Sequence, residues 1–182
     1  ALKSLSNFPN IKIKAYCPTL LSKSISALNY AKSKKIPIID FEKLKSIKES
    51  IDFILNVFST NYFNDQILKI PKYGSFNFHP GILPEYAGLH VHQWAIRNNE
   101  STTGITCHLM KSQLDIGDIL FQTKIPISSK ENGMSLYIKL SKLVGKSIIE
   151  FCKIVSKKEF NELSFKKQKK NNFKLYTHSK AL

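Results

Sequence analysis

The sequence predicts an α/β fold organised around a mostly parallel sheet. Segments with strand-like patterning alternate with segments whose apolar residues recur at helical spacing, as in chains of βαβ units. Residues 51–58 are almost continuously apolar, which is typical of a parallel strand buried on both faces. The 182 residues suit one domain, and 42% of them are apolar, so a substantial core can form.

The individual elements follow from apolar periodicity and from helix and strand breakers. In chain order they are a helix ending near residue 8, a strand at 11–17, a helix at 22–35, a strand at 36–39, a helix at 42–49, a strand at 51–58, a helix at 64–70, a strand at 75–79, a helix at 92–98, strands at 103–110 and 119–125, and a helix at 133–155. Residues 11–17 alternate apolar and polar side chains. Pro37 favours a sheet edge for its strand, because proline cannot donate to a ladder, and Pro71 ends the helix before it.

The strand at 75–79 carries the polar residues of most interest. Side chains alternate along a strand, so Ser75, Asn77 and His79 point to one side, and Phe76 and Phe78 to the other. Asn77 and His79 therefore share a face at the carboxyl end of a strand, where open α/β sheets hold their sites.

Charge is the most unusual feature of the composition. The net charge is +15, and Arg97 is the only arginine among 28 basic residues. Lysine is a point charge and not the preferred reader of phosphate or guanine. Because the lysines are scattered, compositional bias is the favoured explanation, and a polyanionic partner stays open.

Several classes of protein are disfavoured. The three cysteines are widely spaced, which argues for reduced thiols and against a zinc site or disulfides. No run of 18 apolar residues suggests a membrane span, and no secretory signal is visible. No dinucleotide or nucleoside-triphosphate motif is present.

Asn77, His79 and Asp115 supply the groups needed to move an acyl group onto an amine. An amide can stabilise a carbonyl oxygen, an imidazole can carry a proton, and a carboxylate can orient and charge the imidazole. Each residue alone has an ordinary structural explanation, so the hypothesis depends on the three together. His90 and His92 lack a third convergent ligand, so we expect no metal there, and they are candidates for an acceptor pocket.

The segment from residue 73 to 121 resembles the catalytic core of the folate-dependent formyltransferases. Their N-x-H-P-S-x-L-P segment is matched at residues 77–84, and their L-D-x-G loop at residues 114–117, with a family-like interval between the two. Weaker similarity extends the resemblance to about 150 residues. It implies a Rossmann-like, mostly parallel sheet with helices on both faces.

The resemblance also implies residue roles. Asn77 would stabilise the formyl oxygen, His79 would donate or carry a proton, and Asp115 would hold His79 and raise its pKa. The one-carbon donor would be the co-substrate 10-formyltetrahydrofolate. Its pterin would lie against two segments, at the positions Asn61, Phe63, Met110, Ser112, Leu114 and Asp115. The acceptor would lie near Gly81, Leu83, His90 and His92.

The sequence also departs from the family pattern. Gly81 replaces the usual serine, and Ala87 replaces an arginine common in members that act on tRNA or sugars. Residues 16–25 are too short for the basic insertion of the tRNA enzyme, so tRNA is disfavoured as a substrate although possible. The first strand of the family is also missing from the sequence. We therefore assign residues 1–155 to an N-terminally incomplete catalytic domain and residues 156–182 to a basic C-terminal extension.

The resulting hypothesis is a cytoplasmic enzyme of one-carbon metabolism that transfers a formyl group to a primary amine. The amine would belong to a small molecule, an amino sugar or a carrier-bound amino acid. The alternatives are a methionyl-tRNA formyltransferase, a formyltetrahydrofolate deformylase with water as acceptor, and a non-catalytic remnant that binds folate or RNA. Oligomeric state stays open.

Overall fold

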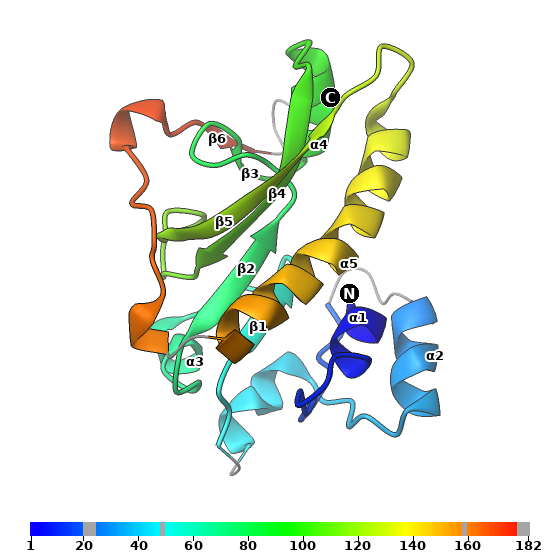
Figure 1. Ribbon diagram of the computed structural model, residues 1–182, viewed down its shortest axis with the longest axis vertical. Coiled ribbons are helices and arrows are strands. Elements are labelled where there is room, and N and C mark those ends of the chain that lie inside the picture. Colours follow the sequence, from blue (N-terminus) through cyan, green and yellow to red (C-terminus); the bar gives the residue numbers. More distant parts are fainter. Residues whose placement is uncertain (20–24, 48–49, 158–159, 178–182) are drawn as a thin grey trace.

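A four-stranded sheet forms the centre of the computed structural model, which describes residues 1–19, 25–47, 50–157 and 160–177 (Figure 1). Its strands lie in the order β1 (Ile54–Val57), β2 (Ser75–His79), β4 (Thr102–Leu109) and β5 (Ile119–Pro126). The α/β fold class is confirmed. The remaining elements are α1 (Leu2–Ser6), α2 (Ile25–Ser33), η1 (Phe41–Ser46), α3 (Asp65–Leu68), β3 (Ala87–Gly88), α4 (Val91–Arg97), α5 (Gly133–Lys157), η2 (Phe160–Glu162), η3 (Lys170–Asn172) and β6 (Leu175–Tyr176).

The strand directions in this sheet are mixed, whereas a mostly parallel sheet was expected. β1 and β2 are parallel, but β4 is antiparallel to both of its neighbours, β2 and β5. The loop of residues 110–118 between β4 and β5 is too short to cross over the sheet, and a parallel pair needs a connection of a dozen or more residues. The connection length therefore decides the direction of the last strand.

Helix α5 covers one face of the sheet and provides most of its core (Figure 1). Its buried residues pack against Phe76 and Phe78 of β2 and against Ile105 and Cys107 of β4. These are the apolar positions that alternate with the polar residues of the same strands. Burial of the apolar face consequently directs Asn77 and His79 to the opposite side of the sheet.

The opposite face is covered near β1 by η1 and α3. Phe41 and Leu44 of η1 pack with Phe63 and with Ile67 of α3, and Ile54 of β1 contacts this cluster. Ile54 pairs in register with Ser75, so it lies on the polar face of β2. Helical segments thus lie on both faces, as expected.

The prediction of two strands near the N-terminus is wrong. Residues 11–17 and 36–39 are linked by a single parallel bridge between Tyr16 and Ile38, and neither segment joins the four-stranded sheet. Strand patterning alone does not extend pairing where no neighbouring strand continues the ladder. Helix α2 lies inside the expected range 22–35, of which residues 22–24 fall outside the described chain. The helix expected at 42–49 is the 3₁₀ segment η1, and residues 48–49 are likewise outside the description.

After α5, residues 160–177 lie along the β5 edge of the sheet and reach β3 (Figure 1). Phe160 and Phe165 pack against the sheet core, and β6 pairs in parallel with β3. We call residues 164–176 the C-terminal strap. The domain boundary expected between residues 155 and 156 stays a prediction.

Candidate active site

A row of three polar side chains crosses the sheet on the face opposite α5. Asn56 of β1, Asn77 of β2 and His108 of β4 are register partners on adjacent strands. Asn56 Nδ2 donates to Asn77 Oδ1 at 3.0 Å, and Asn77 Nδ2 lies 3.2 Å from His108 Nε2. His108 Nδ1 donates to the carbonyl of Leu109 at 2.8 Å, which orients the ring so that Nε2 faces Asn77 and Asp115. This row fixes the direction in which the Asn77 amide donates.

Asp115 joins this row to His79. Asn77 Nδ2 donates to Asp115 Oδ1 at 3.2 Å, and His108 Nε2 lies 3.4 Å from the same oxygen. The other oxygen, Oδ2, lies 3.4 Å from His79 Nδ1 and accepts from the backbone N–H of Gly88 at 2.8 Å. Asn77, His79 and Asp115 therefore meet around one buried carboxylate, and we call them the Asn–His–Asp site.

The environment keeps Asp115 ionised. Burial by itself would raise the pKa of this carboxyl, but His79, His108 and the Gly88 N–H together outweigh burial and lower the pKa to about 2.

The backbone of Asp115 is left-handed, with φ of 54°, and the carbonyl oxygen of Leu109 lies where a side chain at Gly117 would begin. A Cβ there would lie 1.6 Å from that oxygen, so only glycine allows the loop to return this closely to β4.

His79 is largely neutral in the free protein. Burial lowers its pKa below the ordinary value of 6.5, and His108 acts in the same direction. Asp115 and the carbonyl of Tyr86, which accepts from Nε2 at 2.6 Å, raise the pKa without outweighing burial. Asp115 thus acts on His79 in the expected sense, but the net shift is downward, which favours a proton carrier over a standing imidazolium.

The residues expected at the pterin come from two loops that approach one another. Phe63 is buried and packs edge-on against Phe41 with a ring separation of 4.9 Å, and Met110 packs against the same cluster. Ser112 and Leu114 are exposed in the loop that leads to Asp115. Asn61 donates its backbone N–H to Ser59 Oγ at 3.1 Å. The two loops therefore meet at Phe63 and Met110, and the folate-binding role of the six positions stays a prediction.

The four positions expected at the acceptor lie in two separate places, Gly81 and Leu83 after β2 and the two histidines at the start of α4. Gly81 is buried beside His79, where an added Cβ would lie 2.9 Å from Nε2, and Leu83 is buried in a small apolar cluster. His90 and His92 lie at the start of α4 with ring centroids 6.3 Å apart, and burial lowers the pKa of His92. Gly81 thus lies directly against His79, while the two histidines lie along the chain that follows Gly88.

A family model described as formyl transferase matches residues 22–152, which is more than half of the chain. The chain belongs to the formyl transferase family. A methionyl-tRNA formyltransferase from Mycoplasmopsis pulmonis is 33% identical over 138 residues, covering 73% of this chain and 48% of that protein. The chain thus spans about half the length of this relative.

Solved structures of formyl transferases share the fold. An N-formyltransferase from Helicobacter canadensis, in complex with folinic acid and dTDP-3-aminofucose, superposes with a TM-score of 0.67 and 25% identity, over 84% of this chain and 54% of that one. A phosphoribosylglycinamide formyltransferase from Anaplasma phagocytophilum gives a TM-score of 0.77 at 17% identity, over 97% and 93% of the chains. The formyltransferase fold expected from the sequence is confirmed.

Sequence reasoning did not identify three contributors to the Asn–His–Asp site. Asn56 lies in an otherwise apolar strand, and its polar side chain was the available signal. His108 was visible, but only the pairing of β2 with β4 places it beside Asn77. The N–H of Gly88 belongs to the backbone, and no sequence signal points to it. All three depend on contacts between separate elements.

We expect replacement of Asn56 by leucine to lower the rate of the reaction at this site about ten-fold. The change removes the donor that holds Asn77 Oδ1, so the Asn77 amide is free to turn, whereas the branched shape of the side chain is kept. Steady-state kinetics would test this, with Asn161→Leu on the exposed surface of η2 as control. Equal rates in the two variants would contradict an orienting role.

The stability of the protein is expected to fall on acidification because of Asp115. Its folded pKa of about 2 lies below the ordinary value of 3.8, so its contribution is present above pH 3.8 and is lost as pH falls toward 2. The contribution is about 2 kcal/mol. Urea unfolding at pH 5 and near pH 2 should therefore show a smaller loss in Asp115→Asn than in the native chain. Parallel curves for both proteins would contradict the assignment.

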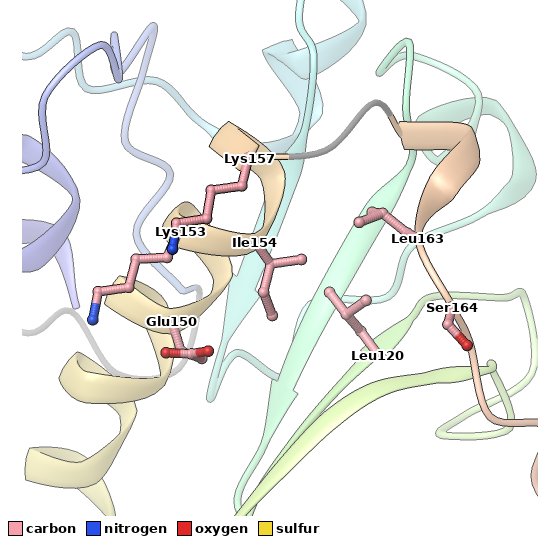
Figure 2. Close-up of a pocket in the computed structure, with 7 residues that line it drawn as sticks. All are labelled: Leu120, Glu150, Lys153, Ile154, Lys157, Leu163 and Ser164. Carbon is pink, nitrogen blue, oxygen red and sulfur yellow. The ribbon is translucent and has the colours of Figure 1, made fainter.

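A hollow of about 300 Å³ lies away from this site, between α5, β5 and the C-terminal strap (Figure 2). It is lined by Leu120, Glu150, Lys153, Ile154, Lys157, Leu163 and Ser164. None of these residues contributes to the Asn–His–Asp site.

No helix among the described residues is long and apolar enough to cross a membrane, and the cytoplasmic location stays a prediction.

Proposed function

We propose that the Asn–His–Asp site transfers the formyl group of 10-formyltetrahydrofolate to a primary amine. The observation that carries this proposal is the single carboxylate of Asp115, which contacts both Asn77 and His79 at the carboxyl end of β2. Membership of the formyl transferase family supports the reaction type. The folinic acid bound by the Helicobacter canadensis relative supports a folate as the donor.

Asn77 is suited to stabilise the oxyanion of the reaction. Both contacts of Nδ2, to Asp115 and to His108, are 3.2 Å long, at the long end of the hydrogen-bond range, so either can be exchanged for a formyl oxygen. Attack by the amine nitrogen forms the new C–N bond and moves charge onto this oxygen. Collapse then breaks the bond between the formyl carbon and N10 of the folate.

His79 and Asp115 are suited to manage the proton. The amine must lose one proton, and the leaving N10 must gain one, so the reaction is balanced without another reactant. A proton accepted by His79 would be stabilised, because the atoms facing its two ring nitrogens, Asp115 Oδ2 and Tyr86 O, are both acceptors. The neutral resting state of His79 leaves room for this proton.

We infer that the acceptor approaches along the chain that follows Gly88. Gly88 donates to Asp115, and the half-buried His90 and His92 follow it directly, so this segment connects the carboxylate to the start of α4. The short region at residues 16–25 and Ala87 favour a small amine or amino sugar. Because one relative is a methionyl-tRNA formyltransferase, charged methionyl-tRNA is a second candidate acceptor and is tested together with the small amines.

The proposal is tested by release of tetrahydrofolate from 10-formyltetrahydrofolate, with and without amino sugars, other small amines and charged methionyl-tRNA. Release that requires one class of amine supports a transferase and identifies the acceptor class. Release that is equally fast without an amine would replace the proposal with a deformylase. Folate binding without release, or salt-dependent RNA binding alone, would overturn the enzyme assignment.

A further inference from the structure

The C-terminal strap adds a short stretch of pairing beside β5. Lys166 exchanges two backbone hydrogen bonds with Ile119, the first residue of β5, at 2.8 and 2.9 Å. This bridge anchors the strap next to the end of the loop that carries Asp115. The side chain at position 168, two residues later, is therefore held close to that loop.

Gln168 binds the Asp115 loop through its amide. Nε2 donates to the carbonyl of Asp115 at 2.8 Å and to the carbonyl of Gly117 at 2.7 Å, which uses both of its protons. The other amide atom, Oε1, is buried with no hydrogen-bond partner among the described residues. The orientation of the Gln168 amide is consequently set by its bonds to the two carbonyls of this loop, because Oε1 makes no bond among the described residues that would fix it.

The strap also contacts the other wall of the site. Lys174 O accepts from the N–H of Ala87 at 3.0 Å, and Tyr176 O accepts from the N–H of Leu89 at 3.0 Å. These bonds flank Gly88, whose own N–H donates to Asp115 Oδ2. The strap is so close that a Cβ at Gly88 would lie 2.1 Å from Tyr176 O. One continuous segment therefore holds both the backbone of Asp115 and the donor to its carboxylate.

We propose that Gln168 is a positioning residue that fixes the Asp115 carboxylate against His79 and Asn77. For its kinetic consequence the inference rests on the proposed formyl transfer. Asp115 has a left-handed backbone, which aspartate tolerates better than most residues but which is less favourable than for glycine, so contacts that restrain this turn stabilise it. The two bonds from Gln168 lie on the carbonyls that bracket this turn, and they supply that restraint.

The test compares Gln168→Met with Lys167→Met, both in the full chain. Methionine keeps the length of the glutamine side chain but cannot donate, and Lys167 is an exposed neighbour in the strap. NMR of the histidine ring resonances follows the titration of His79. The resonance of His79 is assigned by its absence in a His79→Gln variant. Asp115 raises the pKa of His79, so a displaced carboxylate should move this titration to lower pH. Asp115 and His108 are the titratable groups that face His79, and neither is changed in either variant.

In Gln168→Met we expect the His79 titration to move to lower pH and kcat to fall roughly ten- to a hundred-fold, with the KM for the amine little changed. Lys167→Met should match the native chain in both measurements. An unchanged His79 titration with native kcat would overturn the proposal, as would equal effects in both variants. If Gln168→Met does not fold, Gln168→Asn, which is too short to reach both carbonyls, is measured in its place.

This experiment separates the inference from the function on which it rests. The titration of His79 reports the position of Asp115 without any substrate. Suppose that the His79 titration shifts in Gln168→Met while the native chain transfers no formyl group. This result would support the positioning role of Gln168 and overturn the proposed reaction. Native titration in an active Gln168→Met variant would do the reverse.

Discussion

Replacement of Asp115 by asparagine is expected to slow formyl transfer about a thousand-fold. Asparagine keeps the size of the side chain but removes the negative charge that raises the pKa of His79. It also places an amide in a pocket where Asp115 accepts from Asn77 and from the N–H of Gly88. One of these donors must then face another donor, so both the proton carrier and the oxyanion donor are disturbed.

Measurement of kcat over a range of pH tests this expectation. Asp118→Asn is the matched control, because Asp118 lies in the same region and forms only a partly exposed pair with Lys111 at 3.8 Å. It should retain nearly native activity. Full activity in Asp115→Asn, or an equal loss in Asp118→Asn, would remove Asp115 from the reaction.

Asn77→Ala is expected to lower kcat by a hundred-fold or more, or about 3 kcal/mol, as for other losses of one oxyanion donor. The variant removes the only amide that both Asn56 and Asp115 contact in the described structure. Because the positions predicted to bind the folate lie at residues 61–63 and 110–115, the KM for the folate should change little. The effect should therefore appear in kcat and not in donor binding.

The double variant Asn77→Ala and Asp115→Asn gives a sharper test. The two side chains are in direct contact, so their effects should not add, and the double variant should be only slightly slower than the worse single variant. Asn161→Ala, on the exposed surface, should behave like the native chain. Fully additive losses would mean that Asn77 and Asp115 act independently, contrary to the single site described above.

The strand at residues 75–79 shows how much the sequence could establish. Its alternation of polar residues with Phe76 and Phe78 predicted both its limits and the shared face of Asn77 and His79, and the structure has β2 at the same residues. The long helix α5 and strands β4 and β5 were also expected within a few residues. These elements have strong local patterns, and burial of their apolar faces leaves few alternatives.

Other features depended on which segments become neighbours. Residues 11–17 have a strand pattern but form only one bridge, because pairing needs a partner along the whole segment. The direction of β4 and β5 followed from the connections and not from the composition of the strands.

By itself, the sequence determined the α/β class and the approximate elements, and it named Asn77, His79 and Asp115 as one set. Only the tertiary structure decided that Asn56 and His108 flank Asn77 and that Gln168 binds the Asp115 loop. It also decided that the pKa of His79 is lowered, since this pKa depends on burial as well as on Asp115. Periodicity is a local property of a chain, whereas register across strands, burial and the charge around a histidine arise from segments far apart in sequence; Asp115 and Gln168, for example, are 53 residues apart.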